Sequence, residues 1–192
     1  MSHGPPVLYL DFDGVLHHED VWWSPVRGPY FGPKAPPHAK LFEHAGLLAE
    51  ALEPYPDLGI VLSTSWASRY SFSKARGKLP ASLRPRVVGA TFHSSMDRRT
   101  FEGVSRALQI LADVRRRGPW RWLAIDDDTA DWPALYRDRL VASDRVFGLS
   151  SLAVLQDLQH KLQHMMGDDP GEARGDGSSP TDAVAGSMTL HG

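Results

Sequence analysis

The sequence contains no cysteine, which excludes disulfide bonds, thiolate metal sites and a cysteine nucleophile. It also contains no apolar run close to the ~20 residues that a membrane helix needs. The first six residues lack the basic and apolar regions of a secretory signal. We therefore expect a cytoplasmic protein that does not have the membrane as a partner.

Lysine is scarce, with five Lys against sixteen Arg, and the net charge of −2 hides an uneven distribution. The segment 66–121 carries thirteen Lys or Arg and three acidic residues, whereas the remainder is acidic. Such a segment indicates either a basic surface that holds phosphates or nucleic acid, or an arginine-rich solvated surface. A chain of 192 residues is long enough for one domain with a substantial core.

Strand and helix patterns alternate along the chain. Apolar runs and periodicity predict strands at 7–11, 59–62, 86–90, 120–125 and 140–142, and helices at 38–53, 66–70, 100–117, 131–136 and 150–166. The helix 100–117 is expected to turn Phe101, Val104, Leu108, Leu111 and Ala112 to the core. This alternation is typical of an α/β fold in which helices cover a central, mostly parallel sheet.

Two segments fall outside this pattern. Residues 17–37 contain five prolines, which exclude a regular helix, but they also contain four aromatic residues, which disfavour disorder. The segment is interpreted as a lid or binding loop, or as a loop whose aromatics only attach it to the body. Residues 167–192 are rich in Gly, Ser, Asp and Pro and are predicted to be a disordered tail, which leaves one domain at 1–166.

Polar residues follow three of the predicted strands. Asp11 and Asp13 follow the first strand, Thr64 the second, and Asp126 and Asp127 the fourth. Ligands of parallel α/β sheets bind at the carboxyl ends of the strands, so these side chains are expected to meet. Carboxylates crowded together raise one another's pKa or need a cation, and Mg²⁺ prefers oxygen ligands.

This constellation suits phosphoryl transfer. Asp11 would attack phosphorus and form a phosphoaspartate, and Asp13 would protonate the leaving oxygen and then activate water. Thr64 would donate a hydrogen bond to a phosphoryl oxygen, and an Arg or Lys would neutralise the transferring group. Gly14 allows a sharp turn or a close approach of the backbone to a ligand.

These residues also resemble a known family. The segment Asp-Phe-Asp-Gly-Val-Leu at 11–16 resembles motif I of the haloacid-dehalogenase-like (HAD) superfamily, Val-Leu-Ser-Thr-Ser at 61–65 its motif II, and Ala-Ile-Asp-Asp at 124–127 its motif IV. Together with the Ser-Thr-Ser-Trp segment and Gly148-Leu149, they resemble the small HAD domain of Swiss Army Knife RNA-repair proteins over about 7–166. The resemblance implies a three-layer α/β/α Rossmann-like HAD fold with a minimal cap at about 17–54, Mg²⁺ as cofactor, and phosphorylated ends of nucleic acid as a substrate class.

The resemblance also implies roles for individual residues. The catalytic set is Asp11, Asp13, Thr64 and a basic residue, for which the candidates are Arg98, Arg99 and Arg106; Arg99, three residues before Glu102, is the first choice. The metal ligands are Asp11, Asp13, Asp126 and Asp127, with Asp128 and Asp131 as further candidates. Substrate contacts are assigned to Gly14, Ser65, Arg98 and Trp22.

The predicted function is a Mg²⁺-dependent phosphatase that acts through an aspartyl-phosphate on phosphorylated nucleic-acid ends or other large substrates. Members of the superfamily that act on haloacids lack an acid at the position of Asp13, which disfavours dehalogenation. Two alternatives remain open: a catalytically weak module that binds phosphate or a partner, and a phosphatase or nucleotidase of small metabolites.

Overall fold

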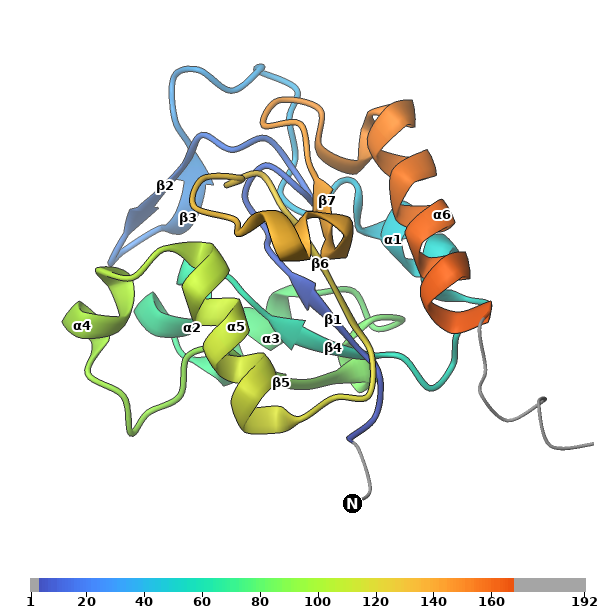
Figure 1. Cartoon of the computed structure of the whole chain (residues 1–192). Helices are drawn as coiled ribbons and strands as arrows, with labels where there is room; N and C mark the ends of the chain where they lie inside the picture. Colours follow the sequence, from blue (N-terminus) through green and yellow to red (C-terminus); the bar gives the residue numbers. More distant parts are fainter. Residues whose placement is uncertain (1–3, 168–192) are drawn as a thin grey trace, which may run out of the picture.

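The computed structural model describes residues 4–167 (Figure 1), in which five parallel strands form a central sheet. In spatial order they are β5 (Val87–Ala90), β4 (Gly59–Leu62), β1 (Val7–Leu10), β6 (Trp122–Asp126) and β7 (Leu140–Ala142). The chain moves outward from β1 to β4 and β5, then returns to β6 on the other side of β1. The order therefore reverses beside β1, which is where such sheets bind ligands.

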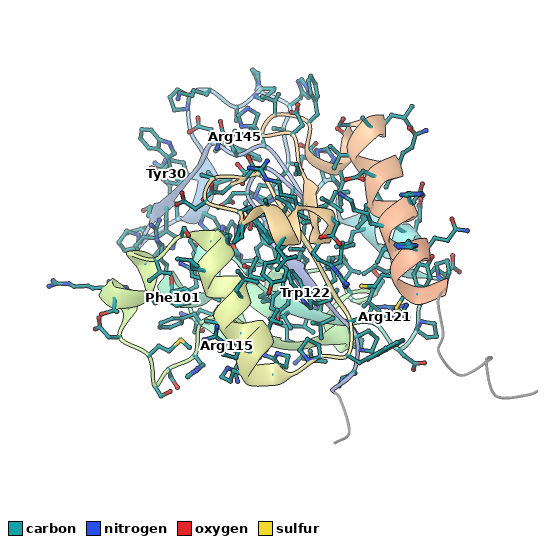
Figure 2. The ribbon with its side chains drawn as sticks, in the orientation of Figure 1. Tyr30, Phe101, Arg115, Arg121, Trp122 and Arg145 are labelled. Atoms are coloured by element: carbon teal, nitrogen blue, oxygen red, sulfur yellow. The ribbon has the colours of Figure 1, made fainter. Side chains whose placement is uncertain are left out.

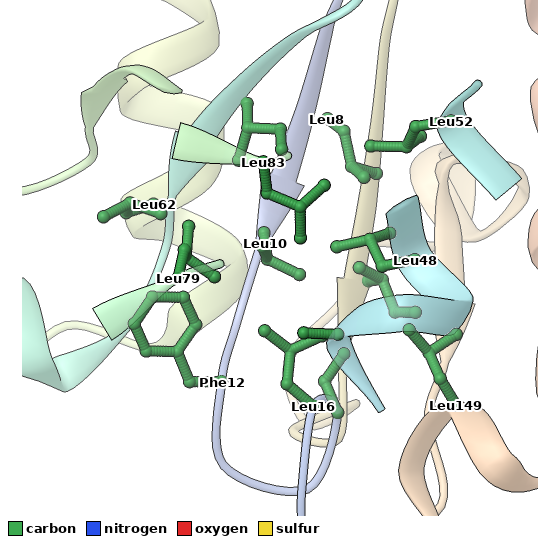
Figure 3. Packing of buried hydrophobic residues seen from close by; sticks show 14 of the residues in the cluster. Leu8, Leu10, Phe12, Leu16, Leu48, Leu52, Leu62, Leu79, Leu83 and Leu149 are labelled. Carbon is green, nitrogen blue, oxygen red and sulfur yellow. The ribbon is translucent and has the colours of Figure 1, made fainter. Parts of the chain in front are cut away.

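Helices cover both faces of this sheet. On one face, Leu8 and Leu10 pack with α1 (Ala45–Leu52), α3 (Phe72–Lys78) and α6 (Leu152–Gly167), as the close-up in Figure 3 shows. On the other face, Tyr9 packs under α5 (Arg106–Arg117) and near the 3₁₀ helix at Ala134–Arg139. The predicted three-layer α/β/α Rossmann-like fold is confirmed, and so are the five strands to within two residues at their ends.

The predicted long helix 100–117 is in fact two helices. A break at 103–105 separates α4 (Arg98–Glu102) from α5. The side-chain amide of Gln109 stabilises the break, because it donates to the carbonyls of Phe101 and Val104 at 2.9 and 2.8 Å and satisfies groups that a continuous helix would pair.

The break also changes the face that α5 buries. Ala107, Ile110 and Asp113 are buried, whereas Leu108, predicted to face the core, is 51% exposed. The closing helix α6 buries Val154, Leu158, Leu162 and Met165, whereas Leu152 at its start is exposed.

The predicted loop 17–37 contains an antiparallel hairpin formed by β2 (Val21–Ser24) and β3 (Gly28–Phe31). Gly28 has φ +74°, which suits the turn, and Pro29 is tolerated because a two-stranded ribbon has only edge strands. Figure 1 shows the hairpin at the end of the molecule opposite the N-terminus. The hairpin and α1 occupy the place of the expected minimal cap. Of the predicted helix 38–53, only Ala45–Leu52 is helical.

The predicted tail at 167–192 lies outside the described residues, apart from Gly167 at the end of α6. Between residues 4 and 167, no helix is both long enough and apolar enough to span a membrane.

Candidate active site

Three carboxylates meet where β1 and β6 end. One oxygen each from Asp11, Asp126 and Asp127 lies within 4.8 Å of the others. The backbone N–H of Asp11 donates to the carbonyl of Ile125 at 3.2 Å, so the parallel pairing of the two strands continues to this point and brings the side chains together. Asp11 and Asp126 are buried, and Asp127 is partly buried.

Arg106, the first residue of α5, supplies the positive charge of this cluster. Its Nε lies 3.2 Å from Asp126 Oδ2, and its Nη2 lies 3.8 Å from Asp11 Oδ1. Burial alone would lower the pKa of Arg106, but the surrounding carboxylates, Asp11 and Asp126 first, raise it. The guanidinium therefore remains charged.

The structure does not bring the other two candidate arginines to the carboxylates. Arg98 and Arg99 lie exposed on α4. The physical reason is the break before Arg106, which gives α5 its own N-terminus beside the ends of β1 and β6. Because the sequence predicts one continuous helix over 100–117, it does not predict a helix N-terminus at Arg106.

One arginine does not balance the acidic charge. The pKa of Asp11 is raised to about 7, chiefly by burial and also by the nearby Asp13 and Asp127, against the lowering effect of Arg106. Burial and Asp11 raise the pKa of Asp126 well above its usual value. Burial also raises the pKa of Asp127, against the effect of Arg145, whose Nε lies 3.5 Å from Asp127 Oδ2.

The carboxylate of Asp13 is not part of this cluster and is held separately. The indole Nε1 of Trp66 lies 3.0 Å from both of its oxygens, and His17 Nε2 lies 3.0 Å from Oδ1. His17 Nδ1 accepts the backbone N–H of Phe42 at 3.2 Å, so the ring proton of neutral His17 is on Nε2 and is donated to Asp13.

These two partners of Asp13 were not found by the sequence reasoning. His17 is fully buried. The signals available were the spacing of four residues from Asp13 to His17 and the tryptophan directly after the Ser-Thr-Ser segment.

Gly14 is required by the turn between Asp13 and the rest of the loop. Its φ is +70°, and a Cβ built on it would lie 2.7 Å from Asp127 Cγ. Its carbonyl accepts the hydroxyl of Ser143 at 2.7 Å, so the turn is tied to the segment after β7. Because Gly14 has no Cβ, the side chain of Asp127 can occupy the space beside it.

The remaining predicted residues have different positions. Thr64 is buried at the end of β4 and caps α2 (Ser65–Arg69), where its Oγ1 accepts the N–H of Trp66 at 3.4 Å. Asp128 donates its backbone N–H to Asp126 Oδ1 at 3.0 Å, whereas Asp131 is exposed. Ser65 lines two neighbouring cavities, and Trp22, 51% exposed on β2, lines one of them.

The cluster fits a divalent cation. Asp11 Oδ1 and Asp126 Oδ2 are buried and, within the described part of the chain, have no hydrogen-bond partner. All donor atoms of the cluster are carboxylate oxygens, which are the ligands that Mg²⁺ prefers. The charge, the burial and the donor set therefore agree with a magnesium site formed by Asp11, Asp126 and Asp127.

Residues 7–154 match the family model described as the HAD domain in Swiss Army Knife RNA repair proteins. The chain belongs to this family. The HAD domain indicates a hydrolase of the phosphatase type, in agreement with the carboxylates at the ends of β1 and β6. No curated protein and no solved structure matches the chain.

Replacing Gly14 by Ala tests whether the close approach of Gly14 to Asp127 shapes the metal site. Because the new Cβ would displace Asp127, Gly14→Ala should weaken Mg²⁺ binding by about 10- to 100-fold in calorimetric titration. The matched control is Gly46→Ala in α1, where a Cβ meets nothing within 4 Å and Mg²⁺ affinity should not change. Equal Mg²⁺ affinity in Gly14→Ala and the natural protein would contradict the prediction.

The raised pKa of Asp11 predicts how metal and pH act on stability. The folded metal-free protein binds a proton at Asp11 up to about pH 7, whereas the unfolded chain releases it near the usual value of 3.8. Stability without metal should therefore fall as pH rises through this window. Because protons compete with Mg²⁺, a hundred-fold excess over Kd should raise Tm by roughly 5–10 °C at pH 8 and by less at pH 5.5.

Thermal unfolding in chelator and in Mg²⁺ checks this prediction. Asp11→Asn is the control, because it removes the titrating group and should flatten the pH dependence. A Mg²⁺-induced shift in Tm that is as large at pH 5.5 as at pH 8 would show that protons and the metal do not share the site.

Proposed function

We propose that the chain is a Mg²⁺-dependent phosphatase that hydrolyses phosphate monoesters through an aspartyl-phosphate on Asp11. The observation that carries this proposal is the partly buried Arg106 between Asp11 and Asp126, with the carboxylate of Asp13 held two residues beyond Asp11. A nucleophile, a fixed cation and an acid–base group are thus available around one point.

Mg²⁺ would be held by Asp11, Asp126 and Asp127 and would offset the repulsion between the carboxylate nucleophile and the anionic phosphate. Arg106 contributes a second, permanent positive charge on the same side. The hydroxyl of Thr64 accepts a bond from the backbone of Trp66, so its proton is free to be donated to a phosphoryl oxygen.

In the first step, an oxygen of Asp11 forms a bond to phosphorus as the bond to the ester oxygen breaks. Asp13 donates a proton to that leaving oxygen, and the alcohol departs. Trp66 and His17 keep Asp13 at a fixed position for this transfer, because each donates a hydrogen bond to its carboxylate.

In the second step, Asp13 takes a proton from water, and the water oxygen attacks phosphorus. The bond between phosphorus and Asp11 breaks, which releases inorganic phosphate and restores the free carboxylate. The proton taken from water leaves Asp13 protonated for the next cycle. Each proton and bond is accounted for by Asp11, Asp13, the substrate and one water molecule.

The proposed substrates are phosphorylated ends of nucleic acid or other large phosphate monoesters. The residues between β1 and β4 contribute a two-stranded hairpin and the eight-residue helix α1, not a separate cap domain. Two open cavities beside Ser65 and Arg69 border the site, one lined by Asp13 and the other by Arg106. The basic segment 66–121 and the RNA-repair context in the family description agree with a polyanion.

Phosphatase assays with an aryl phosphate test the proposal. Activity should require Mg²⁺, disappear in chelator, and fall to background in Asp11→Asn. Arg106→Gln should lower kcat/KM by about 10²- to 10³-fold, because it removes a preorganised charge at the transferring group. Arg99→Gln is the matched control and should stay within about two-fold, since Arg99 lies exposed on α4.

Retained turnover in Asp11→Asn would contradict the covalent step, and a larger loss in Arg99→Gln than in Arg106→Gln would contradict the role of Arg106. Rates for oligonucleotides phosphorylated at the 3′ or 5′ end, mononucleotides and sugar phosphates then separate the substrate classes. Phosphate binding without hydrolysis of any of these compounds would favour a binding module over an enzyme.

A further inference from the structure

A cavity of about 320 Å³ opens directly beside Asp13, between the hairpin and α2. Its lining includes aromatic residues from both elements: Trp22 and Trp23 from β2, and Trp66 and Tyr70 from α2 and its C-cap. Asp13 itself is part of the lining. In the proposed reaction Asp13 gives its proton to the leaving oxygen, so the group attached to that oxygen would extend into this cavity.

The rings of the cavity are preorganised. Trp66 and Tyr70 stack with centroids 5.7 Å apart and planes at 24°, and Tyr70 meets Trp23 edge-on at 5.5 Å. The indole of Trp66 is also fixed by its bonds to Asp13. Trp23 nevertheless remains 46% exposed. An aromatic surface that is held in place but left open suits a planar ring as its ligand.

The alternation of the hairpin distinguishes Trp23 from its neighbour. Trp23 pairs with Pro29, and both line the cavity, whereas Trp22 pairs with Tyr30 and lies with it on the opposite face. The ring nitrogen of Trp22 is tied to Asp20 at 2.9 Å. Trp22, assigned to the substrate from the sequence, also lines the cavity, but Trp23 is the tryptophan that contacts Tyr70 at the end of α2.

Polar groups at the border of the cavity indicate what kind of ring fits. Ser65 and Arg69 line this cavity and also a second, more polar one of about 470 Å³ that includes Arg106. Arg69 is 59% exposed, and within the described part of the chain its one ion pair is at 3.7 Å with Glu102, which is weak at a surface. A plain phenyl ring would leave these donors without acceptors, whereas the edge of a nucleobase provides them.

We infer that this cavity is the leaving-group subsite, that it takes a nucleobase, and that Trp23 and Tyr70 set a preference for nucleotides over sugar phosphates. The inference rests on the proposed function and deepens it, because it assigns the chemical class of the leaving group. The base stacks against Trp23 and Tyr70, Arg69 and Ser65 contact its edge, and the sugar connects it to the phosphate at Asp11.

Adenosine 5′-monophosphate and ribose 5-phosphate form the matched pair of substrates, because they differ only in the base. In the natural protein the nucleotide should have the higher kcat/KM. Trp23→Ala and Tyr70→Ala should lower the ratio of the two kcat/KM values by about 5- to 150-fold, as expected for loss of base stacking. Tyr30→Ala, on the opposite face of the same hairpin, is the control and should leave the ratio within about two-fold.

The ratio separates this inference from the proposed function. Hydrolysis of neither compound, nor of an aryl phosphate, would mean that the proposed function fails. If both compounds are hydrolysed and Trp23→Ala lowers the two kcat/KM values equally, the subsite is contradicted, whereas the proposed phosphatase activity is not. A kcat/KM for phosphotyrosine at or above that of the nucleotide would overturn the assignment to a nucleobase.

A second measurement needs only the natural protein and so holds even if a variant fails to fold. Adenosine, the product left after phosphate transfer, should inhibit hydrolysis of ribose 5-phosphate competitively, because it occupies the subsite. Ribose at the same concentration should not inhibit. Equal inhibition by adenosine and ribose, or none by adenosine, would contradict the inference.

Discussion

The fold is built around a charge cluster in which the partly buried Arg106 pairs with the buried carboxylates of Asp11 and Asp126. Two parallel strands deliver carboxylates to one point in the interior, where an unpaired charge costs several kcal/mol. Arg106 offsets part of this cost, and a divalent cation would pair with the carboxylate oxygens that have no hydrogen-bond partner within residues 4–167. The fold therefore has to hold α5 at one position relative to β1 and β6.

A second buried polar contact secures that position. On the face of the sheet under α5, the hydroxyl of Tyr9 donates to Asp113 Oδ2 at 2.9 Å, and Arg117 Nε donates to the same oxygen at 2.9 Å. Tyr9 lies two residues before Asp11, and Asp113 lies two turns of helix after Arg106. The contact therefore fixes both ends of the ion pair through the elements that carry them.

The opposite side of the site is built by the hairpin, α2 and the loop after β7. Figure 2 shows Tyr30 of the hairpin and Arg145 toward the same end of the molecule. Arg145 pairs with Asp127, and Ser143 holds the Gly14 turn. Trp66 has two functions here, since its indole fixes Asp13 and its ring forms a wall of the cavity beside it. In the proposed reaction, one side chain would serve both to position Asp13 and to bind the leaving group.

Much of this arrangement could be predicted from the sequence, because strands followed by acids and helices with clear caps are local patterns. The convergence of Asp11, Asp126 and Asp127 followed from the parallel sheet alone. The choice among arginines did not, because the break at 103–105 depends on Gln109 reaching back to two carbonyls. The hairpin was not predicted either, because prolines and glycines are typical of a loop. Its strands are defined by their pairing with each other, which is not a local sequence pattern.

The partners of Asp13 could not be predicted from the sequence either. His17 and Trp66 lie far from each other in the sequence, and both contact Asp13 because the loop after β1 packs against α2. Sequence patterns identify the residue types that chemistry needs. They do not identify the neighbours that hold those residues, since such neighbours are selected by the three-dimensional contacts.

The proposed mechanism requires that Asp11 becomes phosphorylated during turnover. The most direct measurement is acid quenching of the protein with Mg²⁺ and substrate, followed by mass spectrometry of the peptide that contains Asp11. With an aryl phosphate, whose leaving group needs little protonation, the predicted result is a phosphoryl group on Asp11 that accumulates further in Asp13→Asn, because water is no longer activated. Turnover of substrate with no phosphoryl group on Asp11 in either the natural protein or Asp13→Asn would contradict the covalent mechanism.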